Sequence, residues 1–429
     1  MKKNSKMILD INDKPPVLKW LLLSMQHVFA MFGATILVPI LVNSAAGSEV
    51  LSIPVALVSS GIGTLIYIIC TRGKSPVYLG SSFAFITPMI VGFTMAGKAG
   101  KAAVFTGIMG VGLVYVLVAL IIKVAGKKWL NKLLPPIIVG PMIMIIGLGL
   151  APTAVEEIGL NLEVVPWKNV VVALVAFFTT AILAVRGKGF FRVIPFLMGM
   201  VAGYIAAMFL GMIDYSTITS AKFLSVPGFY IPFVHYKLNF TAMLTIVPIA
   251  IVTMAEHIGD HKVLGTIIDR DLIEDPGLDR TLMGDGLATF AAGLIGGPAN
   301  TTYGENTSVV GMTKVASVWV TGLAAVIAIL FGFLGKLTAI ISSIPAAVLG
   351  GVAILLYGFI SVNGLKILIQ NQVDFGKTKN VIVAASMLVL GLGGAAISIV
   401  TKNVSVSISG MSLAAIIGIL LNLIIPEEK

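Results

Sequence analysis

The chain has 429 residues, of which 57% are hydrophobic and 11% are charged, and its mean hydropathy is +1.03. Soluble domains carry about 25% charged residues, so this composition excludes a soluble protein and indicates a polytopic membrane protein. The single cysteine, Cys70, excludes an internal disulfide framework. The net charge of +10 suggests nucleic-acid binding at first sight, but basic cytoplasmic loops explain it without a nucleic acid.

Long apolar runs divide the chain into membrane elements. Residues 1–6 are basic and polar, and the first apolar run, from Trp20, covers about 23 residues without a small-residue cleavage site, so we expect a retained span. We expect fourteen elements, at residues 20–43, 50–70, 78–95, 102–122, 132–151, 168–185, 193–214, 241–259, 281–297, 301–315, 317–335, 344–364, 379–396 and 409–425. The third and the tenth open with polar, glycine-containing sequence and leave apolar remainders too short to span at about 1.5 Å per residue.

The distribution of basic residues predicts the orientation. With the N-terminus in the cytoplasm, 22 of the 29 lysines and arginines fall on the cytoplasmic side of these elements and 7 fall outside. This bias favours cytoplasmic termini at both ends of the chain, and therefore an even number of spans. The expected external segment 155–167 carries three glutamates and no basic residue, which agrees with this orientation.

Two patterns recur in both halves of the chain. In the first pattern, a glycine is followed by a threonine three positions later and by a tyrosine 17 positions later. In the second pattern, a proline is followed by a glycine five positions later. The first pattern is found at Gly61, Thr64 and Tyr78 and again at Gly286, Thr289 and Tyr303. The second is found at Pro135 and Gly140 and again at Pro345 and Gly350. Their shared order predicts two halves of seven elements, about residues 15–214 and 240–427. Because seven is odd, the second half enters the membrane in the opposite orientation, which is the inverted repeat of many secondary transporters.

Each of these tyrosines opens a polar break, at residues 78–83 and within residues 300–308. A charge at membrane depth costs several kcal/mol, and irregular backbone survives there only where protein surrounds it or water fills a cavity. We interpret the two stretches as paired broken elements that contact a small polar solute near the midplane. The alternative for 300–308 is a loop outside the membrane.

Such a site would combine backbone donors with carboxylate acceptors. Two helix N-termini would present free N–H groups, including those of Phe83 and Gly304, to carbonyl oxygens of the solute. Glu305 would add two acceptor oxygens for ring or amide N–H groups. A solute with alternating C=O and N–H groups along its edge, such as a nucleobase, matches this set.

The eighth element supplies a second acidic cluster. Glu256 and Asp260 are four residues apart and therefore lie on one helix face. The apolar run before Glu256 places it inside the membrane, where a carboxylate can exchange a proton near neutral pH, as a proton-coupled carrier requires. The alternative is that residues 256–262 form a solvated helix end. His257 points about 100° away from Glu256, and we interpret His27 and His261 as structural or interfacial.

A further carboxylate, Asp285, lies about one turn into the ninth element. We expect it to support Glu305, the alternative being a solvated first turn. The four histidines and the glycine-rich stretches indicate no metal site, nucleophilic triad or phosphate loop, so we predict neither a cofactor nor an enzyme.

These residues resemble one transporter family. The matching segments are 26–35 (QHVFAMFGAT), 78–85 (YLGSSFAF), 255–259 (AEHIG), 275–278 (DPGL) and 300–306 (NTTYGEN). Over nearly its whole length the chain is similar to the nucleobase–cation symporter-2 (nucleobase–ascorbate transporter) family. The family signature matches at Glu305, Asn306, Thr313 and Lys314, whereas Ser308 stands where the signature has glycine.

The resemblance implies an all-α polytopic fold with a 7+7 inverted repeat, whose broken elements 3 and 10 contain short antiparallel strands that meet at the substrate. It implies a core domain of elements 1–4 and 8–11, at residues 1–128 and 240–343. A gate domain would hold elements 5–7 and 12–14, at residues 129–239 and 344–429. It also implies a homodimer.

The resemblance further implies a substrate, uracil, and the residues around it. It implies that the substrate would be bound by Glu256, Glu305, Phe83 and Gly304. To these we add Tyr303 as a substrate-binding residue, and we expect protons to bind at Glu256, Glu305 and Asp260. We expect Asp285, Asn306 and Ser82 to support the set. A glutamate at position 305 resembles the uracil branch of the family more than the xanthine–urate branch.

We therefore expect a proton-coupled uracil importer of the bacterial plasma membrane that works by an elevator-like movement. The main alternative is a purine permease, for xanthine or urate, of the same family. An anion carrier or channel of the same fold is disfavoured because acidic residues at the site repel anions. A membrane-embedded enzyme would need a nucleophile or metal cluster that the sequence does not indicate.

Overall fold

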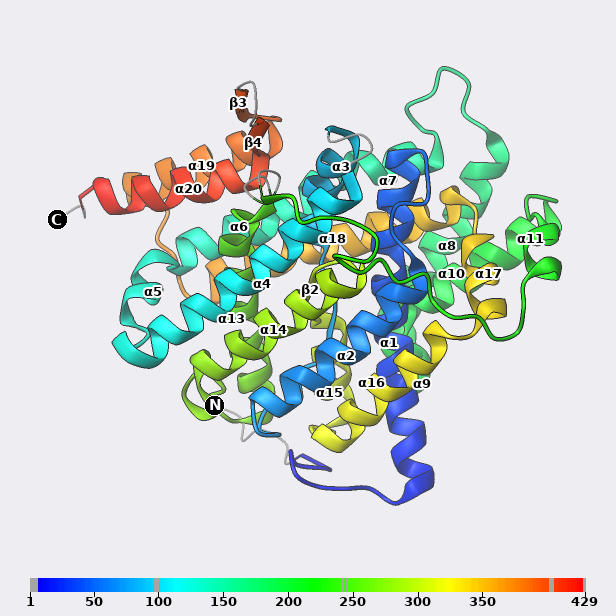
Figure 1. Ribbon diagram of the computed structural model, residues 1–429, viewed down its shortest axis with the longest axis horizontal. Helices are drawn as coiled ribbons and strands as arrows, with labels where there is room; N and C mark the ends of the chain where they lie inside the picture. Colours follow the sequence, from blue (N-terminus) through cyan, green and yellow to red (C-terminus); the bar gives the residue numbers. More distant parts are fainter. Residues whose placement is uncertain (1–6, 96–99, 241–242, 244–245, 401–404, 427–429) are drawn as a thin grey trace.

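The computed structural model describes residues 7–95, 100–240, 243, 246–400 and 405–426. Over these ranges the chain is helical apart from two small sheets of two strands each (Figure 1). The helices are α1 (Val17–Ala46), α2 (Ile53–Cys70), η1 (Phe83–Phe85), α3 (Ile86–Met95), α4 (Gly100–Ala125), α5 (Lys128–Leu133), α6 (Pro136–Gly149), α7 (Ala151–Ile158), α8 (Trp167–Arg186), α9 (Phe190–Val193), α10 (Pro195–Phe209), α11 (Tyr215–Ser220), α13 (Ile249–Ile268), η3 (Ile273–Gly277), α14 (Leu278–Ile295), α15 (Gly304–Thr313), α16 (Val318–Gly332), α17 (Gly335–Ser342), α18 (Ala346–Gln370), α19 (Thr378–Leu392) and α20 (Gly410–Ile424). The strands are β1 (Leu79–Ser81), β2 (Asn300–Thr302), β3 (Ala396–Val400) and β4 (Ser405–Ser409).

In the described part of the chain, six stretches of helix are long and apolar enough to cross a membrane, namely α1, α2, α4, the run from α6 into α7, α8 and α18. Five shorter apolar helices accompany them, over residues 83–93, 195–209, 318–332, 378–392 and 410–424. Together they confirm the multi-pass membrane protein that the composition predicts.

Small residues bring the helices around β1 and β2 into close contact. Gly61 of α2 lies directly against the backbone of Ala325 in α16, and Gly286 of α14 lies against the backbone of Gly112 in α4. Side chains at these glycines would overlap the neighbouring helix, so α2 and α16, and α14 and α4, pack at short distance. Of these helices α2 and α14 contact the first sheet, as do α1 and α13.

The remaining helices form a second group. Within it α6 packs on α18, and α18 and α10 both pack on α8, while α19 pairs with α20 and also contacts α6. Gly364 of α18 lies against the carbonyl of Gly140 in α6, and Gly351 of α18 lies against Ala173 of α8. The close helix contacts again depend on residues without a bulky side chain.

The first sheet joins distant parts of the chain. β1 pairs antiparallel with β2, with Gly80 opposite Thr301. Ser60 and Thr64 of α2 donate hydrogen bonds to the carbonyl of Leu79, at 2.6 and 3.3 Å, and Thr289 of α14 donates to the carbonyl of Asn300 at 3.1 Å. Each strand is followed at once by a helix, β1 by η1 and α3 and β2 by α15.

Two segments differ from the sequence-based expectation. The eighth element was expected to end at residue 259, but α13 continues to Ile268, because Asp260 and His261 find partners within the protein and the helix ends only at Asp269 in the left-handed conformation. The hairpin of β3 and β4 between α19 and α20 was not expected. Its signal is the alternation of serine with apolar residues at 405–409, which is the period of a strand.

Candidate substrate site

Two helix N-termini flank the first sheet. Phe83 opens η1 and Gly304 opens α15, so the backbone N–H groups of both have no partner inside their own helices. Gly304 borders open space, because no atom lies within 4 Å of the position that a Cβ would take there. Glu305 follows in the first turn of α15 and is half-buried. The start of α15 therefore places a backbone N–H group and the Glu305 carboxylate next to each other in sequence, inside the protein.

The second acidic cluster lies against the same strand. Thr301 Oγ1 donates a hydrogen bond to Glu256 Oε2 at 3.3 Å, and Thr302 Oγ1 donates to Asp260 Oδ2 at 2.5 Å. Both carboxylates stand on α13 and are half-buried. Strand β2 thus holds the acidic face of α13 beside the N-terminus of α15.

The four carboxyl groups expected at the site are close enough to interact electrostatically. Glu256 interacts through space with Asp260, Asp285 and Glu305, and Asp260 also interacts with Asp285 and Glu305. Like charges this close repel one another strongly where little water screens them. A bound proton or an N–H-rich solute would relieve that repulsion.

Asp285 has a different partner from the one expected. Its Oδ2 lies 2.8 Å from Nδ1 of His257, and both side chains are fully buried, so it supports α13 through His257 and is not hydrogen-bonded to Glu305. The expectation is corrected in this respect, because the face of α14 that carries Asp285 packs toward the buried side of α13. Helix geometry points His257 away from Glu256, and in this direction it meets Asp285.

A chain of polar contacts continues behind this pair. The ring of His261 stacks on that of His257, with 4.0 Å between centroids. His261 Nδ1 lies 2.7 Å from the backbone carbonyl of His257, and its Nε2 lies 2.5 Å from the hydroxyl of Tyr67. Because a carbonyl only accepts, Nδ1 carries the proton and Tyr67 donates to Nε2. The contact of His261 with Tyr67 ties α13 to α2.

Tyr303 and Gly80 hold the two strands together. The Tyr303 hydroxyl accepts a hydrogen bond from Thr35 at 3.0 Å and donates one to the carbonyl of Ser81 at 3.0 Å. Its ring lies directly on Gly80, where a Cβ would overlap it. The buried Tyr303 side chain is therefore engaged in fixing β1 beside the start of α15.

Asn306 and Ser82 occupy the places next to the two helix starts. The amide nitrogen of Asn306 donates to the carbonyl and to Nδ1 of His27, both at 3.1 Å, which fastens α15 to α1. The backbone N–H of Ser82 donates to Ala299 at 2.9 Å, and its buried hydroxyl has no partner among the described residues. Ser308 is exposed, so the serine at this position of the signature meets no close packing.

The second helix group reaches the site through a residue that the sequence analysis did not single out. Tyr357 of α18 packs edge-to-face on Phe83, with 6.1 Å between ring centroids. Its hydroxyl is buried and lacks a hydrogen-bond partner in the described part of the chain. Glu305 likewise borders a narrow gap lined by Gly33 of α1 and by Met200 and Val352 of the second group. A lone tyrosine in an apolar helix was the available signal for Tyr357.

Across the described ranges, no group of three or more histidine, cysteine, aspartate or glutamate side chains is arranged to hold a metal ion. The site offers hydrogen bonds and charge, and this suits the binding of a polar solute.

The chain matches known proteins over nearly its whole length. Residues 18–400 match the permease family. The chain is 49% identical to the uracil permease of Bacillus caldolyticus, over 98% of this chain and 95% of that protein. It is 46% identical to the uracil permease of Bacillus subtilis (strain 168), over 99% of this chain and 96% of that protein. The fold is also similar to that of the murine solute carrier 26 family member A9 anion transporter in the inward-facing state, with a TM-score of 0.71. The two sequences are 11% identical, over 96% of this chain and 68% of that one, so this likeness concerns the fold alone.

Proposed function

Because this chain belongs to the permease family, we propose that it imports uracil across the bacterial plasma membrane by proton symport. The observation that carries the proposal is the start of α15, where Glu305 stands beside open space at Gly304. The names of the two Bacillus relatives, which are similar over nearly their whole length, support uracil as the substrate.

The chemistry of the base fits the groups around this space. Uracil carries ring N–H groups between carbonyl groups, so its edge needs both acceptors and donors. Glu305 and Glu256 would accept from the N–H groups, and the amides of Phe83 and Gly304 would donate to the carbonyl oxygens. Tyr303 would contribute by holding the strands, and Tyr357 would cover the base from the second helix group.

We also propose that the fold is an inverted repeat of two halves with seven membrane elements each. In this assignment α2 corresponds to α14 and α4 to α16. Exchanging the halves then turns the packing of α2 on α16 into the packing of α14 on α4, as a two-fold axis requires. The antiparallel pairing of β1 with β2 has the same symmetry. Tyr78 precedes β1 whereas Tyr303 follows β2, so the two tyrosines of the sequence pattern are not equivalent positions.

In the same proposal the two helix groups are a core domain, at residues 1–128 and 240–343, and a gate domain, at residues 129–239 and 344–429. Between α13 of the core and the helices α6 and α18 of the gate, the contacts are apolar or small. Gly259 of α13 faces Ile143 of α6 and Ile367 of α18. Apolar contacts of this kind can slide at low cost, and this supports an elevator-like movement of the core past the gate.

Proton coupling would follow from the crowded carboxylates. Moving the core with Glu256, Asp260 and Glu305 all ionised would carry several uncompensated charges through a poorly hydrated boundary. Protonation of one of them together with uracil binding would lower that cost, so loaded and protonated protein would move most readily.

The assembly in the membrane completes the proposal. The bias of basic residues favours cytoplasmic termini at both ends. In an apolar stretch of 18 residues of α8, only 22% is buried within the chain. The outer face of α8 is therefore left for lipid or for a second copy in a homodimer.

The test is uptake of labelled uracil by the purified chain in liposomes, with and without an inward proton gradient. We expect uptake that follows the gradient and is not reduced by excess xanthine, and we expect Glu305→Gln to abolish it. Full competition by xanthine would favour the purine alternative. Absence of uracil uptake, with protein that is monodisperse in detergent, would overturn the proposal.

A further inference from the structure

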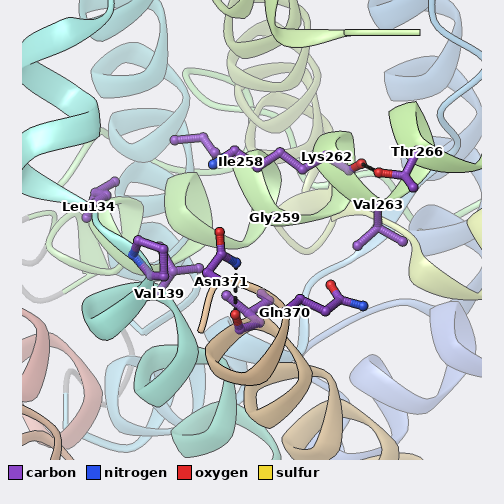
Figure 2. A pocket seen from close by; sticks show the side chains of 11 residues that line it. Leu134, Val139, Ile258, Gly259, Lys262, Val263, Thr266, Gln370 and Asn371 are labelled. Atoms are coloured by element: carbon purple, nitrogen blue, oxygen red, sulfur yellow. Dashed lines mark hydrogen bonds between the residues drawn. The ribbon is translucent and has the colours of Figure 1, made fainter. Parts of the chain in front are cut away.

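A separate cleft lies along α13, where the two helix groups meet (Figure 2). Its volume is about 210 Å³, which suits a small solute. Side chains of α13 form one wall, those of α18 form the opposite wall, and Leu134 and Val139 close a third side. None of the residues expected at the substrate site lines it.

The cleft has an apolar floor and a polar rim. Leu134, Val139 and Ile258 are buried, and together with Ile367 they form the floor. The rim consists of four exposed polar side chains, Lys262, Thr266, Gln370 and Asn371. An apolar surface with a few polar groups at its edge is the usual composition of a small-molecule site, and it suits a flat ring whose hydrogen-bonding groups lie on its circumference.

The polar rim offers both donors and acceptors. The amide nitrogen of Asn371 donates to the carbonyl of Ile367 at 2.8 Å, which leaves its carbonyl oxygen to accept from a ligand. The carboxamide of Gln370 has no protein partner within the described ranges, and a carboxamide offers C=O and N–H side by side. Lys262 adds a cation that donates to a carbonyl oxygen. The two carboxamides offer both donors and acceptors to an uncharged heterocycle, whereas an anion would use only the lysine and the carboxamide N–H groups.

The cleft also lies on the path toward the cytoplasm. Gly259 and Val263 line it, and they follow Glu256 by three and seven residues, so the same side of α13 leads from Glu256 to the cleft. The C-terminal end of α13, the start of α6 and the end of α18 all lie on the side that the basic residues assign to the cytoplasm.

We propose that this cleft is a second, weaker binding site, in which a planar heterocycle with adjacent C=O and N–H groups is held by Gln370, Asn371 and Lys262 after it leaves the substrate site. The inference rests on the proposed function, because uracil is the ligand of this class that the protein would release there. A base in the cleft lies between α13 on one side and α6 and α18 on the other.

Protection of a cysteine tests the site in the full chain. In a Cys70→Ser background, Thr266→Cys places a thiol on the rim, and Lys366→Cys places one on the exposed face of α18 outside the cleft. We expect uracil to slow the reaction of a maleimide with the first thiol and not with the second. The concentration for half-protection should rise roughly tenfold when Gln370 and Asn371 are both replaced by alanine, because two hydrogen bonds are lost. Lys262→Ala should raise it less.

The decisive comparison uses Glu305→Gln, which disables the first site. Half-protection of the Thr266→Cys thiol should occur at the same uracil concentration with and without this change. The inference would be overturned if Glu305→Gln changed the uracil concentration for half-protection, if uracil gave no protection, or if protection were equal after loss of both carboxamides. Protection by inorganic phosphate but not by uracil would also overturn it. Uptake by the unmodified chain separates the two proposals: if uracil is imported but never protects the thiol, only the second site is wrong.

Discussion

Replacing Gly80 by alanine tests how firmly the two strands are held at the site. The added methyl group would overlap the ring and hydroxyl of Tyr303. That ring is held in place by the hydrogen bonds of its hydroxyl to Thr35 and Ser81, each 3.0 Å long. Overpacking of this kind costs about 1–3 kcal/mol, and a ring that swings away loses two hydrogen bonds worth about 1 kcal/mol each. The structure therefore gives a cost of about 2 kcal/mol by either route.

We expect Gly80→Ala to lower the midpoint of thermal unfolding in detergent by a few degrees and to weaken uracil binding roughly tenfold or more. Thermal unfolding and equilibrium binding of labelled uracil measure the two effects. In the double variant with Tyr303→Phe the ring is free of its hydrogen bonds, so the two changes should cost less together than the sum of each alone.

Gly304→Ala is the matched change at the start of α15, which follows the other strand. No atom lies within 4 Å of its Cβ position, so the midpoint should stay the same, whereas the methyl group would enter the space beside Glu305 and weaken uracil binding. Gly358→Ala on α18, which also meets no atom within 4 Å, should change neither quantity. A Gly80→Ala protein with unchanged stability and affinity, or a Gly304→Ala protein that binds uracil normally, would refute the reasoning.

Three further changes should separate buried from exposed interactions, each measured as the midpoint of thermal unfolding in detergent. Asp285→Ala leaves His257 buried without its partner and should lower the free energy of unfolding by about 3–5 kcal/mol. Asp285→Asn should lower it less because the amide keeps a hydrogen bond to His257. Equal losses of stability in the two variants would contradict the pairing. Asn306→Leu removes both hydrogen bonds to His27 and should cost about 1–3 kcal/mol and also weaken uracil binding. Lys127→Ala breaks an ion pair whose carboxylate is 67% exposed, and it should change the midpoint hardly at all; a large drop would show that exposed pairs matter here.

Much of the fold could be read from composition and local pattern. Apolar runs gave the membrane helices, because the cost of a charge in lipid acts on each segment by itself. The polar residues at 78–83 and 300–308 mark the segments that contain β1 and β2, and the family resemblance found in these segments is confirmed by the match over residues 18–400. Helix geometry placed Glu256 and Asp260 on one face of α13 without any knowledge of its neighbours.

Local pattern was least informative where a polar residue is satisfied by a distant partner. The end of α13 was placed too early because Asp260, His261 and Lys262 look like a solvated terminus. In the structure Asp260 accepts from Thr302, which is 42 residues away, and His261 accepts from Tyr67, which is 194 residues away. Buried polar groups are hydrogen-bonded, but the sequence does not say by which partner.

The sequence by itself thus determined that this is a multi-pass membrane protein, where polar segments separate its apolar runs, and which carboxylates share a helix face, because each of these depends on residues close together in the chain. Only the tertiary structure decided that Asp285 pairs with His257, that Tyr357 lies on Phe83, and that α13, α6 and α18 enclose a cleft. These features depend on how each helix is rotated about its axis and which helix it meets. In an apolar chain nearly every helix face is hydrophobic, so packing of small residues, and not hydrophobic periodicity, fixes those rotations.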